Sequence, residues 1–233
     1  MNLSEMPPVS VLEERIGYHF QNQYLLLCAL THTSYANEQK IHKYESYERL
    51  EFLGDAVLEL VSSAFLYHKY PDEREGKLSK IRSSLVCEPA LAYCARDIEL
   101  EEFIRLGRGE EQTGGRQNDS IISDVCEAVI GAMYLDSGSL DAPQKFIMTF
   151  ILSDLEGKLL FYDAKSTLLE KVQEKGGSVH YKLIGEEGPG HNKLFRAAVY
   201  EDDHFLAEGE GKTKKNAEQH AALKALKSYE TSI

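Results

Sequence analysis

Hydrophobic residues follow a helical spacing over the first two thirds of the chain. Apolar positions recur there every three or four residues, the period of a helix with one buried face. One long apolar stretch ends at Pro71, a residue that cannot continue a helix, and another ends at Asp-Ser-Gly, residues 136–138. The pattern predicts helices at 11–15, 23–30, 47–70, 77–86, 89–98, 120–135 and 142–155, and a glycine-rich loop at 107–115.

The pattern changes in the last third of the chain. Short alternating apolar runs predict strands at 179–185, 194–200 and 204–209, joined by turns at 188–190 and 201–203. Helices are predicted on either side, at 166–175 and 214–229. We therefore expect an α+β protein with an all-α domain at 1–157, a short linker at 158–162 and an α-β-β-β-α domain at 163–233.

Composition agrees with a globular protein. Of 233 residues, 42% are hydrophobic and 27% are charged. No apolar run approaches the roughly 18 residues of a membrane span, and the N-terminus lacks the basic and apolar regions of a secretory signal. We expect a cytoplasmic protein without a membrane partner. Its cysteines form no Cys-x-x-Cys pair and are predicted to be reduced; they are Cys28, Cys87, Cys94 and Cys126.

The negative charge is concentrated in the first domain. The chain carries a net charge of −12, yet residues 163–233 hold eleven Lys and Arg against twelve Asp and Glu, a net charge of −1. The remaining −11 belongs to residues 1–162. Most of these acids must be solvated surface, but the excess is compatible with a metal site built from carboxylates.

Three acidic residues stand in one of the most apolar stretches. Glu48, Glu51 and Asp55 are spaced i, i+3, i+7, which places them on one face of the predicted helix at 47–70. Leucine, valine and phenylalanine side chains surround them. Clustered anions away from water are unfavourable unless a proton, a partner or a metal ion neutralises them. This spacing therefore marks a candidate site.

The predicted helix at 120–135 repeats the arrangement with Asp124 and Glu127. If the two apolar helices pack together, Glu51, Asp55, Asp124 and Glu127 converge. Oxygen ligands without His or Cys favour Mg²⁺ or Mn²⁺ over zinc, and such ions serve phosphoryl chemistry. Solvated ion pairs explain most single acidic residues, but two pairs on two apolar helices favour the metal site.

Other signals are weaker. The eight histidines show no metal-ligand spacing, and His32 is expected to be a structural hydrogen-bonding residue. Gly211-Lys212-Thr213 is similar to the end of a phosphate-binding loop, but Leu206 stands where that motif requires glycine. Neither pattern changes the interpretation of the carboxylates.

Residues 48–55, Glu-Arg-Leu-Glu-Phe-Leu-Gly-Asp, resemble the signature of the ribonuclease III family. Further motifs in the bacterial order support this resemblance at 31–38, at 75–79 with Arg82, at 106–110 and at 120–131. Residues 163–226 resemble the family's double-stranded-RNA-binding domain, through Pro-Gly-His at 189–191 and Gly-x-Gly-x-x-Lys-Lys-x-Ala-Glu-Gln at 209–219. The resemblance covers nearly the whole chain.

The resemblance implies a homodimeric endonuclease that cleaves double-stranded RNA with Mg²⁺, or with Mn²⁺ in its place. Such an enzyme leaves 5′-phosphate and 3′-hydroxyl ends with short 3′ overhangs, and processes ribosomal RNA precursors and other structured RNAs. Glu51, Asp55, Asp124 and Glu127 match the family's metal-binding carboxylates, which are also catalytic. The resemblance further implies that the catalytic set includes two supporting acids, Glu48 and Glu75.

The second domain is expected to recognise RNA by shape, phosphates and 2′-hydroxyls, because duplex RNA hides its base edges. Lysines at the start of the predicted last helix favour phosphate, and Glu170 and Gln173 can bond 2′-hydroxyls. The predicted RNA-binding residues are Glu170, Gln173, His191, Lys212, Lys214 and Lys215. One departure from the family is Gln117-Asn118-Asp119, where many relatives carry basic residues; this questions an RNA-backbone contact there.

Two other functions compete with hydrolysis. A pure binding module, such as an RNA chaperone or regulator, would grip duplex RNA and rarely cut it. Intact acids at all four ligand positions count against it. A di-iron carboxylate bundle usually needs Glu-x-x-His pairs, and residues 48–51 and 124–127 contain none.

Overall fold

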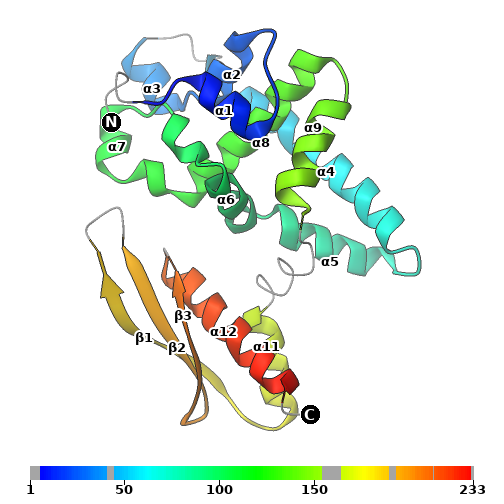
Figure 1. The fold of residues 1–233 in the computed structure, drawn as a ribbon, viewed down its shortest axis with the longest axis vertical. Coiled ribbons are helices and arrows are strands. Elements are labelled where there is room, and N and C mark those ends of the chain that lie inside the picture. The colour runs from blue at the N-terminus through cyan, green and yellow to red at the C-terminus, as the bar shows by residue number, and fades with distance from the viewer. Residues whose placement is uncertain (1–5, 41–44, 154–163, 189–192, 212, 232–233) are drawn as a thin grey trace. The chain divides into compact units, whose positions relative to one another are not determined.

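The computed structural model describes residues 6–40, 45–153, 164–188, 193–211 and 213–231 (Figure 1). The chain divides into two compact units, Met1–Ser153 and Asp154–Ile233. The predicted linker at 158–162 and the expected boundary between domains therefore lie outside the described residues. Each unit is described by itself.

The first unit is helical, and α4 and α8 are its longest helices (Figure 1). Around these two lie shorter helices, of which α1, α2, α5 and α6 match predicted segments. The α-helices are α1 (Val9–Ile16), α2 (Gln23–Ala29), α3 (Thr33–Glu38), α4 (Glu48–Lys69), α5 (Glu75–Val86), α6 (Glu88–Asp97), α7 (Arg108–Gln112), α8 (Asp119–Ser137) and α9 (Asp141–Phe146).

The core of this unit lies where α4 packs against α8. Leu58 of α4 and Ile122, Val125 and Val129 of α8 have no solvent-accessible surface. The two backbones approach very closely because glycines face each other. A Cβ atom on Gly54 would lie 1.8 Å from the carbonyl oxygen of Glu127. The close crossing brings the backbones that carry the candidate carboxylates together.

The structure corrects the predicted loop at 107–115. It contains the short helix α7, and Gly115–Gln117 forms a 3₁₀ turn. The Gly107 N–H donates to Ser34 Oγ at 2.9 Å, and a Cβ atom on Gly107 would lie 2.8 Å from the Ser34 carbonyl oxygen. This contact with α3, itself a helix that the sequence pattern did not predict, fixes the loop from a distant part of the chain.

The predicted helix at 142–155 also differs in detail. Helix α9 continues as a π-helical turn at Ile147–Ile151, and residues 154 and 155 lie outside the described residues. Ile147 and Ile151 are buried, so the wider turn still directs apolar side chains inward. Strand-like pairing in the described part of this unit is limited to one bridge between Thr31 and Arg105.

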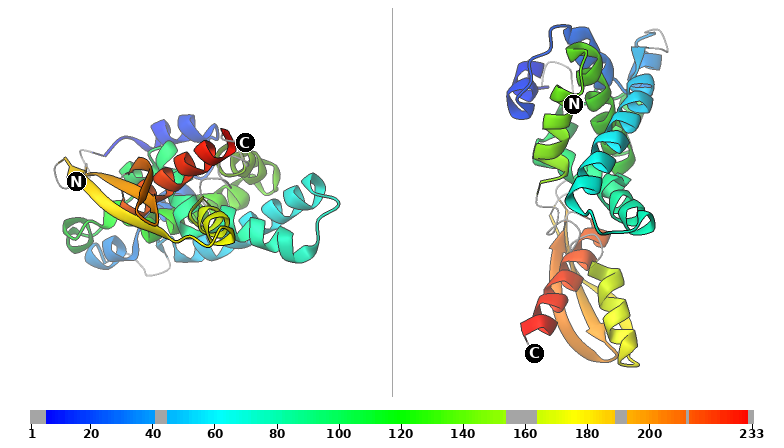
Figure 2. Two further views of the ribbon diagram at one scale, coloured as in Figure 1. Left: turned by 90° about the horizontal axis from the view of Figure 1, so that it is seen from below. Right: turned by 90° about the vertical axis from the view of Figure 1, so that its right-hand side faces the viewer.

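The second unit has the predicted order. Helix α11 (Ala164–Glu174) precedes strands β1 (Val179–Glu187), β2 (Leu194–Glu201) and β3 (His204–Gly211), and α12 (Lys214–Thr231) follows. The strands form an antiparallel sheet in the order β1-β2-β3. Both helices lie on one face of the sheet (Figure 2). Buried side chains of the two helices and of β2 and β3 form a common core: Leu168, Val172, Val199, Ala207, Ala221, Ala222, Ala225 and Leu226.

Small residues let α12 lie close to β3. A Cβ atom on Gly209 would lie 2.2 Å from the Ala221 nitrogen, and one on Gly211 would lie 2.6 Å from the Ala217 nitrogen. The start of α12 is therefore held directly against the end of β3. This contact positions the lysines of the first turn of α12.

Candidate functional site

A row of acidic residues runs along α4. Glu48 and Asp55 are exposed, and Glu51 between them is half-buried. The row continues to Glu59, which stands four residues after Asp55 and was not predicted. Glu59 forms an ion pair with Arg82 Nε of α5 at 2.7 Å. The spacing of the row is the one expected from residues on one helical face.

Helix α8 contributes Asp124 and Glu127, both half-buried. The helix begins at Asp119 because the Asn118 side chain accepts a hydrogen bond from the Ser120 N–H at 3.0 Å. Asp119 forms an ion pair with Arg96 at 2.6 Å, and Arg96 also donates to the Gln117 carbonyl at 3.1 Å. The residues that depart from the family pattern, 117–119, thus fix the start of α8 and tie it to α6.

The carboxylates of α4 and α8 converge on Glu127. The pKa of Glu127 is raised from its ordinary value to about 8; burial is the largest cause, and the charges of Asp55, Glu51 and Asp124 act in the same direction, with a smaller contribution from Glu59. Interactions of this size require the groups to be close together and poorly hydrated. The four acids predicted on the two helices therefore lie near enough to interact through their charges.

The pKa of Glu51 is also raised by burial and by neighbouring carboxylates. Burial is the largest cause of its raised pKa, and the charges of Asp124, Glu48 and Asp55 act in the same direction. Glu48 therefore lies near the converging carboxylates. A group of like charges with raised pKa values is a region that a cation would stabilise.

The pKa of Asp124 is raised by some of its surroundings and lowered by others. Burial raises its pKa, and a hydrogen bond from the Tyr47 hydroxyl to Asp124 Oδ2 at 3.3 Å lowers it. The charge of Glu88, at the start of α6, raises it again. Neither Tyr47 nor Glu88 was predicted. Tyr47 could have been suspected because it directly precedes the acidic row, whereas Glu88 becomes relevant only once α6 packs against α8.

His32 has the structural role expected of it. It caps α3, where its Nδ1 lies 2.7 Å from Ser34 Oγ and 3.1 Å from the Ser34 nitrogen. Its ring packs against the Tyr47 ring at a centroid distance of 5.5 Å. Burial lowers its pKa, although the charges of Glu110 and Asp124 oppose this. His32 therefore packs against the tyrosine that donates a hydrogen bond to Asp124.

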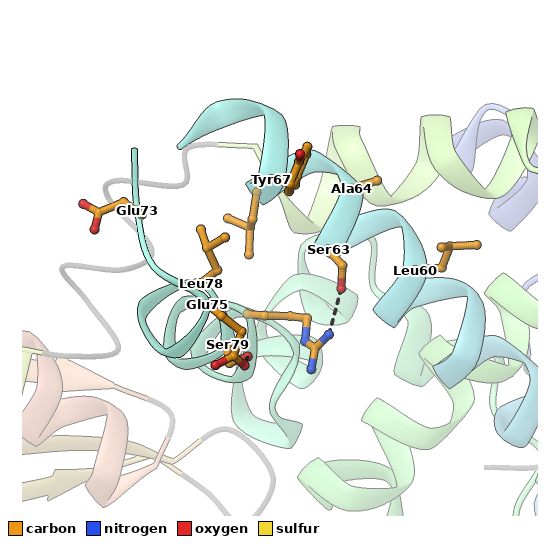
Figure 3. Close-up of a pocket in the computed structure, with 10 residues that line it drawn as sticks. Leu60, Ser63, Ala64, Tyr67, Glu73, Glu75, Leu78 and Ser79 are labelled. Carbon is orange, nitrogen blue, oxygen red and sulfur yellow. Dashed lines mark hydrogen bonds between the residues drawn. The ribbon is translucent and has the colours of Figure 1, made fainter. Parts of the chain in front are cut away.

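Glu75 lies in a different setting from the four converging acids. It begins α5, is exposed, and accepts a hydrogen bond from Ser79 at 2.8 Å. Glu75 lines a hollow of about 580 Å³, to which Leu60 and Tyr67 of α4 also contribute. Figure 3 shows these side chains on α4 and α5. Arg82 lines the same hollow and binds Glu59, so the hollow adjoins the end of the acidic row.

The donor set suits a hard divalent cation by its chemistry. All four converging side chains offer carboxylate oxygens, which Mg²⁺ and Mn²⁺ prefer. In the part of the chain that the structure describes, no group of three Asp, Glu, His or Cys side chains is arranged to hold an ion. The carboxylate chemistry and the charge interactions suit such an ion, whereas the described side-chain positions do not form an arrangement that would hold one.

In the second unit, Lys214 and Lys215 are exposed in the first turn of the 18-residue helix α12. Backbone N–H groups and the positive end of the helix dipole favour phosphate at such a position. Glu170 and Gln173 are exposed on α11, one turn apart. The other two predicted RNA-binding residues, His191 and Lys212, lie outside the described residues.

A helix that crosses a bilayer must be both long and apolar. None of the described helices combines the length and the apolar character that crossing a bilayer needs.

Comparisons with known proteins cover both units. Residues 22–155 match the family model "Ribonuclease-III-like", and residues 164–229 match "Double-stranded RNA binding motif". A protein named Ribonuclease 3 from Bacillus velezensis is 48% identical over 92% of this chain and 87% of its own length. Another Ribonuclease 3, from Caldanaerobacter subterraneus, is 48% identical over 94% of this chain and 96% of its own length.

One solved structure resembles the first unit. The nuclease domain of ribonuclease III from Campylobacter jejuni, described with a flexible region involved in dimer formation, matches with a TM-score of 0.58 and 39% identity. The match covers 63% of this chain and 98% of that domain.

Proposed function

We infer that the chain, which belongs to the ribonuclease III family, is an endonuclease that cleaves double-stranded RNA. The convergence of Glu51, Asp55, Asp124 and Glu127 from two packed helices carries this inference. A protein that only bound RNA would have no use for clustered anions, three of them half-buried, which destabilise a fold unless they are neutralised. The double-stranded-RNA-binding motif at 164–229 supplies the substrate class.

The proposed cofactor is Mg²⁺, with Mn²⁺ able to replace it. Glu51, Asp55, Asp124 and Glu127 are the residues that would hold it. When bound, a divalent ion of this kind lowers the pKa of water and stabilises charge on phosphate oxygens. The protein's own part is to gather the carboxylates and to keep them partly away from water.

Glu127 is the most strongly perturbed member of this set. Its pKa of about 8 means that near neutral pH, without a cation, its carboxyl group is largely protonated. A divalent cation held by the neighbouring carboxylates would favour the ionised form of Glu127, which could then act as a ligand. We propose that protonation of Glu127 in the absence of a cation limits the charge repulsion within the acidic cluster.

Two acids have proposed supporting roles. Glu48 acts on the site through charge, because it raises the pKa of Glu51. Glu75 accepts a hydrogen bond from Ser79 and lines the hollow beside α4. Its exposed carboxylate is proposed to interact there with water molecules or ions that accompany the bound RNA. Both belong to the proposed catalytic set, around the four ligands.

RNA binding is assigned to the second unit. Lys214 and Lys215 are proposed to contact phosphates at the start of α12, and Glu170 and Gln173 to bond 2′-hydroxyls in a minor groove. His191 and Lys212 remain proposed contacts from the sequence resemblance alone. Few lysine contacts imply that binding weakens with added salt, though less steeply than for a strongly basic protein.

A homodimer is proposed from the outward face of α4. Phe52 is 81% exposed, Leu60 is 55% exposed and Tyr67 is 69% exposed, and they recur at the spacing of one helical face. A hollow of about 630 Å³ beside Phe52 is lined by Tyr24, Leu135 and neighbouring residues. Exposed apolar surface of this extent is typical of an interface.

The proposed products are 5′-phosphate and 3′-hydroxyl ends with short 3′ overhangs, and the proposed substrates are ribosomal RNA precursors and other structured RNAs. A cytoplasmic location is proposed because the cysteines are all free thiols: Cys28, Cys87, Cys94 and Cys126.

A cleavage assay tests this function. The full chain is incubated with end-labelled duplex RNA, and with the matching single strand, in Mg²⁺, in Mn²⁺ or in EDTA. We expect cuts in the duplex with either metal, and no cuts in EDTA or in the single strand. The products should be ligated to an RNA 3′-hydroxyl end without prior treatment with a kinase, because they carry 5′-phosphates. Stable binding without cleavage in both metals would favour the RNA-chaperone alternative.

A further inference from the structure

Tyr47 joins three parts of the first unit. It is 6% exposed and directly precedes α4. Its N–H donates to the Thr31 carbonyl at 2.9 Å, and its own carbonyl accepts from the Glu51 N–H at 2.9 Å. The residue therefore fixes the point at which α4 begins, and with it the position of Glu51.

The side chain of Tyr47 reaches the other helix of the site. Its hydroxyl donates to Asp124 Oδ2 at 3.3 Å, across 77 positions of sequence. The bond engages one carboxylate oxygen and restricts rotation of the group. A carboxylate held in this way presents its second oxygen in a limited set of directions.

The Tyr47 ring is itself supported. His32 packs against it at a centroid distance of 5.5 Å and an interplanar angle of 31°. The His32 ring is held in turn by Ser34, whose Oγ lies 2.7 Å from Nδ1. Ser34, His32, Tyr47 and Asp124 thus form a continuous series of contacts, from the cap of α3 to the carboxylate site.

We propose that Tyr47 is a positioning residue, whose hydroxyl holds Asp124 in the orientation that receives the divalent ion. The inference rests on the proposed function of the carboxylate site. Residues that orient a metal ligand remove conformational freedom that binding would otherwise have to remove, and their loss weakens metal affinity by about 10–100-fold.

Tyr47→Phe removes a single oxygen and tests the proposal. The chain offers a matched control in Tyr18→Phe, because the Tyr18 hydroxyl donates to Asp136 Oδ2 at 2.7 Å, the same pair of groups outside the carboxylate site. Mn²⁺ binding to each full-length protein is measured by electron paramagnetic resonance without RNA. Cleavage of duplex RNA is then titrated with Mg²⁺, and melting in EDTA is recorded.

We expect Tyr47→Phe to bind Mn²⁺ about tenfold more weakly and to need about tenfold more Mg²⁺ for half-maximal cleavage. Its rate at saturating Mg²⁺ should recover to within about threefold of wild type, because the ligands themselves are intact. Tyr18→Phe should match wild type in both metal titrations. A purely structural role for Tyr47 would lower the melting temperature without this shift in metal dependence.

The proposal is overturned if Tyr47→Phe binds Mn²⁺ like wild type, if saturating Mg²⁺ does not restore its rate, or if it fails to fold while Tyr18→Phe folds. Failure of the proposed function gives a different result. In that case wild type itself leaves duplex RNA intact at every metal concentration, and the Mn²⁺ measurement still decides the role of Tyr47.

Discussion

At the scale of single residues, the most strongly perturbed group of the candidate site is the carboxyl group of Glu127. This side chain is only half-buried, yet burial together with three neighbouring carboxylates raises its pKa to about 8. The acids were predicted from sequence because their spacing on apolar helices is unusual. Tyr47, which bonds Asp124, and Glu88, which raises its pKa, were not, since their roles depend on contacts between distant segments.

The raised pKa of Glu127 predicts how stability depends on pH in metal-free protein. Between its ordinary pKa of 4.5 and about 8, the folded state binds more protons than the unfolded state. The free energy of unfolding should therefore fall as pH rises through that window, by at most about 1.4 kcal/mol per pH unit for one group. Denaturant titrations in EDTA from acidic to mildly alkaline pH measure this.

Glu127→Gln should reduce this slope, and the raised pKa values of Glu51 and Asp124 should leave a smaller one of the same sign. Adding Mg²⁺ to wild type should reduce the loss at high pH, since the ion binds the ionised form. Stability that is flat or rises with pH in EDTA would contradict the convergence of these carboxylates.

At the scale of elements, the close crossing of α4 and α8 is what makes a shared site geometrically possible. A Cβ atom on Gly131 would lie 2.2 Å from the Leu50 carbonyl oxygen, where only backbone atoms could give way. Gly131→Ala should therefore destabilise the protein by about 1–3 kcal/mol and raise the Mg²⁺ concentration needed for cleavage. Chemical denaturation and a metal titration test both effects.

Gly76→Ala is the matched control for this change. Gly76 lies in α5, and a Cβ atom there would meet no atom within 4 Å. We expect a neutral or stabilising effect of up to about 1 kcal/mol, because alanine is the better helix former. Equal responses of the two variants would show that the crossing does not constrain the site.

Elements also show where sequence patterns stop being informative. The helices α4 and α8 were predicted within one or two residues at each end, because long apolar periodicity and clear stop residues define them. The short helix α7 was predicted as loop. Its glycines favour a turn locally, but contacts of Gly107 with α3 and of Arg116 with the Glu101 carbonyl hold it in place.

At the scale of the whole molecule, RNA cleavage is proposed for the first unit and most of the RNA binding for the second. Deleting residues 163–233 removes the exposed Lys214 and Lys215 and the rest of the RNA-binding motif. We expect duplex affinity to fall strongly at physiological salt while some cutting survives at low salt, where the remaining contacts are less screened. A truncated protein that cuts at full rate at high salt would contradict this division.

The proposed homodimer makes a separate prediction at this scale. Phe52→Asp places a charge on the most exposed large apolar side chain of α4. It should shift the protein from dimer to monomer in sedimentation velocity at micromolar concentration, because burying an unpaired charge is strongly unfavourable. The control is Leu183→Asp, a 42% exposed position on β1 of the second unit, which should remain dimeric.

The central claim is that the converging carboxylates serve to cut RNA rather than to bind it. Glu127→Gln keeps the shape of the side chain and removes its charge, and Glu14→Gln makes the same change at an exposed position of α1. The decisive measurement compares duplex binding and Mg²⁺-dependent cleavage for both variants. We predict that Glu127→Gln binds nearly like wild type but does not cleave, while Glu14→Gln does both. Cleavage by Glu127→Gln at the wild-type rate, or a loss of binding as large as the loss of cleavage, would contradict the account.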